Sequence, residues 1–180
     1  MAESLYFEDL KIGDSWTSRG RTVTETDIVN FACHTGDFDP LHIDHTFAGQ
    51  SPFRKPIAHG ILGIAWVAGL SSMYPAVNTE VFLAVSQWEF HLPIFVGDTL
   101  RVVNEVVGLE AKGRRRGQVR WFRKLINDEG KTVQSGYFDT LVARRIRKSS
   151  TNSGAEPLKG PHLLSPKRES RSARADLEGT

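Results

Sequence analysis

The pattern of apolar and polar residues divides the first 145 residues into a helical part followed by a part rich in strands. A short helix is predicted after Thr24, where acidic first-turn residues precede an apolar stripe and Gly36 ends the pattern. Residues 37–56 are rich in Asp, Pro and Gly, so we expect an ordered loop there. A regular helix is not expected in this segment, because Pro40 interrupts it.

Residues 60–73 are almost entirely apolar or small, which predicts a helix that is buried on all sides. The run is shorter than the roughly 20 residues that are needed to cross a bilayer. Four later segments have the pattern of strands separated by turn residues: 81–90, 99–107, 118–126 and 135–142. One buried helix facing an antiparallel sheet of several strands predicts an α+β protein.

The composition changes after about residue 145. Residues 146–180 are dominated by Ser, Gly, Pro, Lys and Arg and have no helical or strand periodicity. We therefore expect one folded domain, residues 1–145, and a basic, disordered tail, residues 146–180. Charges nearly balance in the folded part, so neither a nucleic-acid nor a membrane partner is expected for it.

Cys33 is the one cysteine, so no intrachain disulfide can form. It lies in the apolar run 28–33 and is expected to be buried as a small hydrophobic residue. The acidic start of the chain lacks the basic and apolar regions of a signal peptide. A cytoplasmic protein is expected on these grounds.

One loop carries a candidate catalytic pair. Its sequence is Thr35-Gly36-Asp37-Phe38-Asp39-Pro40-Leu41-His42. A histidine titrates near neutral pH and a carboxylate can exchange a proton with it, which is what moving water across a double bond requires. The alternative for this pair is structural: Asp37 caps a turn and His42 packs.

A second run, residues 56–60, ends where the buried helix begins: Pro56-Ile57-Ala58-His59-Gly60. The amide of Gly60 has no intrahelical partner and lies at the positive end of the helix dipole. It therefore suits a carbonyl oxygen that becomes an enolate. The alternative is that Gly60 only allows the helix to pack tightly, and that His59 is a hydrogen-bonded structural residue.

These two runs resemble the signature of the MaoC-like dehydratases, also called (R)-specific enoyl-CoA hydratases or type 2 hydratases. In that family the pattern Gly-Asp-x-Asn-Pro-Leu-His is followed by Ala-His-Gly at the start of the helix of a hot-dog fold. Other positions resemble the family along about residues 5–145: Phe7-Glu8-Asp9-Leu10 with Gly13-Asp14, Phe31-Ala32, Asp44 with Ala48, Phe53, and Pro93 with Gly97-Asp98-Thr99. The resemblance implies a hot-dog fold, in which an antiparallel sheet wraps around a central buried helix.

The resemblance also implies roles for the site residues. Asp37 and His42, the candidate catalytic residues, jointly hold a water molecule, and together they take its proton and deliver one to the α-carbon. Gly60 stabilises the thioester oxyanion, and Asp39 and His59 complete the candidate substrate-binding set. The implied reaction is reversible hydration of a trans-2-enoyl thioester to a (3R)-3-hydroxyacyl thioester. Coenzyme A or an acyl carrier protein carries the acyl group, no separate cofactor is expected, and a homodimer or assembly of dimers is implied.

Asp39 departs from the family pattern, which usually has Asn at this place. An ionised carboxylate only accepts hydrogen bonds, whereas an amide also donates them. Two alternatives therefore stay open. One is a related enzyme that adds another nucleophile to an acyl thioester, or hydrolyses it. The other is a non-catalytic protein that binds acyl thioesters.

A basic cluster lies in or beside a predicted strand: Arg114, Arg115, Arg116, Arg120, Arg123 and Lys124. In one interpretation these residues bind the phosphates of coenzyme A. In the favoured one they form a solvated edge or outer face of the sheet. No metal site is expected, because His42, His45 and His59 lack Cys or Glu partners at the usual ligand spacings.

Overall fold

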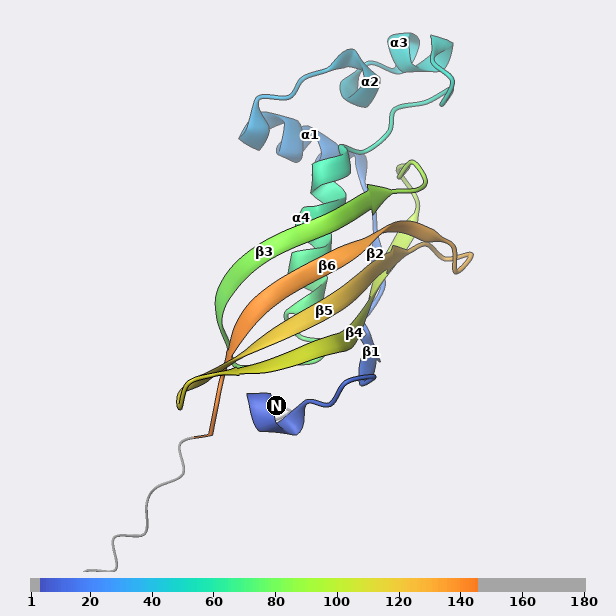
Figure 1. The fold of residues 1–180 in the computed structure, drawn as a ribbon. Coiled ribbons are helices and arrows are strands. Elements are labelled where there is room, and N and C mark those ends of the chain that lie inside the picture. The colour runs from blue at the N-terminus through green and yellow to red at the C-terminus, as the bar shows by residue number, and fades with distance from the viewer. Residues whose placement is uncertain (1–3, 146–180) are drawn as a thin grey trace, which may run out of the picture. The chain divides into compact units, whose positions relative to one another are not determined.

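An antiparallel sheet curves around one helix in the computed structural model, which describes residues 4–145 (Figure 1). The helices are the 3-10 helix η1 (Phe7–Asp9), α1 (Glu25–Thr35), α2 (Pro40–Ile43), α3 (His45–Gln50) and α4 (Gly60–Ser71). The strands are β1 (Ser15–Thr17), β2 (Arg21–Thr22), β3 (Thr79–Phe90), β4 (Thr99–Lys112), β5 (Arg116–Ile126) and β6 (Thr132–Ala143). Their order across the sheet is β1-β4-β5-β6-β3, and β2 pairs with β4. The predicted α+β architecture is confirmed.

Helix α4 is the central helix that the apolar run predicted. The prediction that it is buried on all sides is wrong, because Ile61, Ala65 and Gly69, spaced four residues apart, form an exposed face. Leu62, Gly63, Trp66 and Val67 are buried along the helix, because apolar and small side chains allow close packing against a sheet. Figure 1 shows α1, α2 and α3 together at the N-terminal end of α4. The segment that carries Asp37 to His42 therefore lies where the first amides of α4 have no partner within the helix.

Helix α1 begins and ends where the sequence predicts. The hydroxyl of Thr24 accepts a hydrogen bond from the Asp27 amide at 3.2 Å, and the Asp27 carboxylate accepts one from the Thr24 amide at 2.9 Å. This reciprocal pair is a capping box. At the other end Gly36 has φ of 77°, a left-handed conformation that glycine adopts without a steric penalty.

Cys33 is exposed, so the prediction that it is buried is wrong. Ile28 and Ala32 form the buried stripe of α1, four residues apart on one face. Cys33 follows Ala32 directly and is rotated by about 100° around the helix axis, away from that face.

The segment 37–56 is not a loop throughout, because it contains α2 and α3. Pro40 is the first residue of α2 and starts the helix instead of interrupting it. Proline suits this position, since the amide hydrogen that it lacks would have no partner within the helix. Each of the two short helices is capped by the aspartate before it, Asp39 for α2 and Asp44 for α3.

Burial alternates along β5, as a strand with one face on the core requires. The buried positions are Gly117, Val119, Trp121, Arg123 and Leu125. The interpretation of the basic cluster as a solvated face is therefore wrong at Arg123, because strand alternation turns this side chain inward. The other five members of the cluster are exposed or half-buried.

Strand β3 forms one edge of the sheet and pairs with β6 among the described residues. It carries large exposed apolar side chains, namely Val81, Phe82, Leu83, Val85 and Phe90. In the part of the chain that the structure describes, no helix is long and apolar enough to span a membrane. The predicted tail, residues 146–180, lies outside the described residues, so its disorder stays a prediction.

Candidate active site

His42 lies on α2 and is held by a backbone contact. Its Nδ1 is 2.7 Å from the carbonyl oxygen of Ile57. Because a carbonyl oxygen only accepts hydrogen bonds, Nδ1 carries a proton, and in the neutral tautomer the lone pair is therefore on Nε2. The contact fixes the orientation of the half-buried imidazole and leaves Nε2 outside it.

His59 precedes the first residue of α4 and is almost fully buried, with 3% of its surface exposed. Its Nε2 donates a hydrogen bond to the backbone carbonyl oxygen of Asp37 at 3.0 Å. Its ring stacks on His42 with 3.8 Å between centroids, and Phe31 of α1 packs on it at 5.1 Å. His59 therefore ties Asp37 and His42 to the N-terminal end of α4.

The carboxylate of Asp37 faces outward beside this stack. One oxygen lies 3.9 Å from Nε2 of His59, and 53% of the side chain is exposed. The other oxygen accepts a hydrogen bond from the Asp39 amide at 3.3 Å. A side-chain oxygen of Asp37 and a ring nitrogen of His42 lie within 4.8 Å of each other. The carboxylate is also open to solvent.

Asp39 has a structural contact of its own. Its Oδ1 accepts a hydrogen bond from the Leu41 amide at 2.8 Å, which caps α2. The oxygen of an asparagine side chain caps a helix equally well, so the family residue and Asp39 fit the same contact. The cap holds the first turn of α2, and His42 lies in that turn.

Gly60 begins α4, so its amide has no partner within the helix. It lines a cavity of about 350 Å³ together with His42. The ring of Phe90 lies against Gly60, at 2.8 Å from the place where a Cβ would be. His42 and Gly60 therefore line one pocket.

Sequence reasoning missed five residues that line this pocket, namely Phe90, His91, Leu92, Ile94 and Gln134. The buried amide of Gln134 donates to the Gly60 carbonyl oxygen at 3.1 Å and accepts from the indole of Trp88 at 3.2 Å. These residues lie on β3 and β6 or just after β3, far from the motif in sequence. A polar residue at an inward position of a strand is the one signal that points to Gln134.

Asp37, His42 and His59 each offer a potential ligand atom, and these atoms lie within 4.8 Å of one another. These residues come together only in the fold, from the segment before α2, from α2 and from the start of α4. The two imidazole rings stack on each other with 30° between their planes, and His59 Nε2 already donates to the Asp37 carbonyl oxygen. The contacts suit proton transfer better than shared coordination, and the expected absence of a metal stays a prediction.

The sheet curves around a central helix, and a histidine and an aspartate lie at the N-terminal end of that helix. This arrangement is the hot-dog class of fold with a candidate acid–base pair. Residues 10–126 match the family model described as "MaoC like domain". The match covers more than half of the chain, so this chain belongs to the MaoC-like domain family.

Two relatives show how far the similarity extends. An (R)-specific enoyl-CoA hydratase of Rhodospirillum rubrum is 31% identical over 140 residues, which are 78% of this chain and 93% of the relative. The protein MaoC of Klebsiella aerogenes is 37% identical over 100 residues, which are 54% of this chain and 29% of that protein. The chain thus spans less than a third of the length of the second relative.

Solved structures agree with the fold. A crystal structure of the MaoC-like dehydratase from Rhodospirillum rubrum has a TM-score of 0.72 and 27% identity, covering 79% of this chain and 99% of that chain. A Mycobacterium tuberculosis protein described as having a double hot-dog fold has a TM-score of 0.69 and 24% identity. That match covers 79% of this chain and 45% of that chain. The hot-dog fold expected from the sequence is confirmed.

Proposed function

We propose that this protein catalyses the reversible hydration of a trans-2-enoyl thioester to a (3R)-3-hydroxyacyl thioester, carried by coenzyme A or an acyl carrier protein. One observation carries the proposal: the contact with Ile57 uses Nδ1 of His42 and leaves Nε2 free beside Asp37, while His42 and Gly60 line one pocket. Family membership and the names of the relatives support the same reaction.

The reaction adds a hydroxyl group to the β-carbon and a proton to the α-carbon. Nε2 of His42 accepts a proton from water as the C–O bond forms, and the Asp37 carboxylate orients that water. Negative charge develops on the thioester oxygen, where the amide of Gly60 at the positive end of α4 stabilises it. The pair formed by Asp37 and His42 then returns a proton to the α-carbon, so the protein ends with the protons it began with.

His59 and Asp39 act in this proposal by positioning. His59 holds the backbone of Asp37 and the ring of His42, and Asp39 caps the helix that carries His42. The protein is proposed to need no separate cofactor, because both proton-transfer groups and the amide belong to the chain.

We also propose a homodimer formed along β3. An exposed strand edge with large apolar side chains is prone to pair with another strand. Phe90 at the end of β3 packs on Gly60, and both line the candidate active site. A second subunit paired at this edge would therefore lie beside that pocket. Light scattering after gel filtration tests this proposal. Leu83→Lys is expected to give monomers, whereas Ile12→Lys, at an exposed apolar residue outside β3, is expected to leave the assembly unchanged.

The activity test follows the loss of the conjugated double bond in short and medium trans-2-enoyl-CoA thioesters. His42→Ala and Asp37→Asn are expected to lower kcat/KM by about 10²-fold to 10⁴-fold, the usual contribution of general acid–base groups. His45→Ala is the matched control, because His45 is exposed on α3 and pairs with Glu25 away from the pocket. Equal activity of all three variants would disprove the assignment of the pair.

The same assay separates the alternative functions. Release of free coenzyme A without a hydroxyacyl product would identify a thioester hydrolase. Binding of the thioester without any turnover would identify a binding protein. A cytoplasmic location is part of the proposal, and cell fractionation with an antibody tests it.

A further inference from the structure

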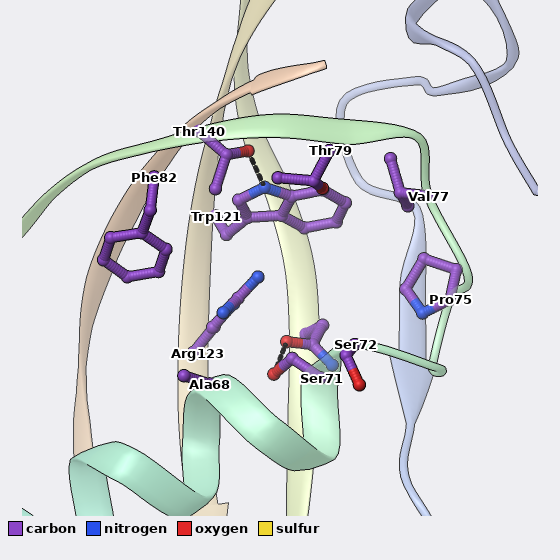
Figure 2. Close-up of a pocket in the computed structure, with 11 residues that line it drawn as sticks. Ala68, Ser71, Ser72, Pro75, Val77, Thr79, Phe82, Trp121, Arg123 and Thr140 are labelled. Carbon is purple, nitrogen blue, oxygen red and sulfur yellow. Dashed lines mark hydrogen bonds between the residues drawn. The ribbon is translucent and has the colours of Figure 1, made fainter. Parts of the chain in front are cut away.

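A second cavity, of about 140 Å³, lies at the other end of α4 (Figure 2). Ala68 and Ser71 of α4, with Ser72 directly after the helix, line it on one side, and residues of β3 to β6 line it from the sheet. Ala68 is eight residues beyond Gly60, which corresponds to about 12 Å along the helix axis. This cavity and the candidate active site share no lining residue.

The buried neutral polar groups around this cavity already have partners. Ser71 hydrogen-bonds to the side chain of Asn104 at 2.8 Å, and the amide of Asn104 donates to the Tyr74 carbonyl oxygen at 2.6 Å. The indole of Trp121 donates to Thr140 at 3.0 Å. Figure 2 shows the Ser71 and Trp121 contacts on either side of the guanidinium of Arg123.

Arg123 is the exception. It lies on the inward face of β5, directly across from Asn104 on β4, and only 7% of its surface is exposed. Within residues 4–145 it forms no hydrogen bond or ion pair, and its buried Nε has no partner. Its guanidinium lies over the rings of Phe138, at 4.6 Å, and Trp121, at 5.6 Å.

A buried positive charge without an anion is unfavourable, because the ring faces and the carbonyl end of α4 replace its hydration only in part. Burial lowers the pKa of Arg123 to about 10, so the group still carries its charge at neutral pH. A planar guanidinium forms two parallel hydrogen bonds with a carboxylate. The walls beside it include Pro75, Val77 and Phe82, which favour an apolar stem on that carboxylate.

We propose that this cavity binds the carboxylate of a small organic acid with an apolar stem, and that Arg123 is its anchor. The same chemistry has two possible sources. One is a free acid, and the other is the distal carboxylate of an acyl thioester whose reacting end lies near Gly60. The second source rests on the proposed hydratase activity, whereas the first does not.

The first arm of the test titrates hexanoate and benzoate into the full chain by calorimetry, with hexanol and benzyl alcohol as uncharged probes. Both acids are expected to bind and the alcohols to bind at least 10-fold more weakly, as the loss of charge-assisted hydrogen bonds implies. Arg123→Met should weaken the acids to the level of the alcohols. Lys124→Met, which removes a positive charge from the opposite face of β5, should leave binding unchanged.

Ala68→Leu provides a second variant that keeps Arg123 and adds side-chain volume to the cavity wall. It is expected to weaken acid binding without changing the charge of the protein. Circular dichroism checks that each variant is folded. If the acids bind equally well to the wild type and to Arg123→Met, Arg123 does not anchor free acids in this cavity.

The second arm compares kcat/KM for trans-2-enoyl-CoA thioesters that end in a carboxylate with methyl-terminated ones of equal length. A preference for the carboxylate that is lost in Arg123→Met would assign the cavity to the substrate, even if free acids do not bind. Without acid binding and without such a preference, the proposal is wrong. If methyl-terminated thioesters are not hydrated either, the hydratase proposal fails. The titration with free acids then decides by itself whether the cavity binds a carboxylate.

Discussion

The imidazole of His59 donates a hydrogen bond to the backbone carbonyl of Asp37 across 3.0 Å, although the two residues are 22 positions apart. This bond joins the segment that carries the proposed catalytic pair to the N-terminal end of the central helix. The stacking of His42 on the same ring makes the connection stiffer. Positioning of the pair therefore depends on a residue that is itself almost completely buried.

His59→Ala is expected to lower kcat by about 10-fold or more while KM changes little, because a small misplacement of catalytic groups has this scale of effect. His59→Gln should recover part of kcat, since its amide can donate to the Asp37 carbonyl. Steady-state kinetics with an enoyl-CoA thioester measures both. A rise in KM with unchanged kcat would instead indicate direct substrate contact by His59.

Asp39→Asn is expected to keep both activity and stability, because either side chain caps α2 at the Leu41 amide. Asp39→Ala removes the cap and should lower the free energy of unfolding by about 0.5–2 kcal/mol. It should also lower kcat, since His42 lies on α2. Urea denaturation and initial rates test the pair of variants. A large loss of activity in Asp39→Asn would mean that the charge itself takes part.

Gly63→Ala is expected to destabilise the protein by about 1–3 kcal/mol through overpacking, because the added Cβ would overlap the side chain of Gln134. Gly69→Ala is the matched control on the same helix, since no atom lies within 4 Å of its added Cβ. It should raise stability by up to about 1 kcal/mol through helix propensity. Urea denaturation measures the stability of both variants. The coupling between positions 63 and 134 follows from Gly63→Ala, Gln134→Ala and the double variant. Strict additivity in the double variant would contradict the overlap.

Arg123→Met is expected to leave the free energy of unfolding unchanged or to raise it by about 1–4 kcal/mol, because it replaces a buried charge with an apolar side chain of similar volume. Burial lowers the pKa of Arg123 to about 10, so the folded state bears a penalty at neutral pH that is relieved only as the pH rises through that value. Thermal and urea unfolding at pH 7 test this, with Lys124→Met as the control. A loss of several kcal/mol would show that the ring contacts stabilise the charged group.

Asp27 is expected to contribute to acid sensitivity. Burial acts to raise its pKa, but hydrogen bonds from Thr24 and the charge of Arg21 together lower the pKa below the usual 3.8. A carboxylate with a lowered pKa stabilises the fold above about pH 4, and this contribution is lost as the pH falls through the folded-state value. Asp27→Asn should therefore lower Tm at pH 7 and differ less from the wild type near pH 2. Asp128→Asn, on an exposed turn, should change Tm little at either pH.

Local sequence signals predicted much of the fold. Helix α1 follows from a capping box and a terminal glycine, and α4 follows from an apolar run, because both signals act within a few residues. The same reasoning failed at Pro40, where a residue that breaks a helix interior begins a helix instead. It also failed at Cys33 and Arg123, because an apolar neighbourhood or a run of charges does not say which face a side chain takes.

The motif residues Asp37, His42 and Gly60 were identifiable from the order of residues alone, since their chemistry and the helix start are local properties of the chain. Their arrangement was not. The free nitrogen of His42 depends on the carbonyl of Ile57, the pocket wall depends on Phe90 and Gln134 from distant strands, and the buried position of Arg123 depends on the register of β4 and β5. These contacts join residues 15 to 74 positions apart, or across paired strands, and packing of the whole sheet around α4 is what brings them together.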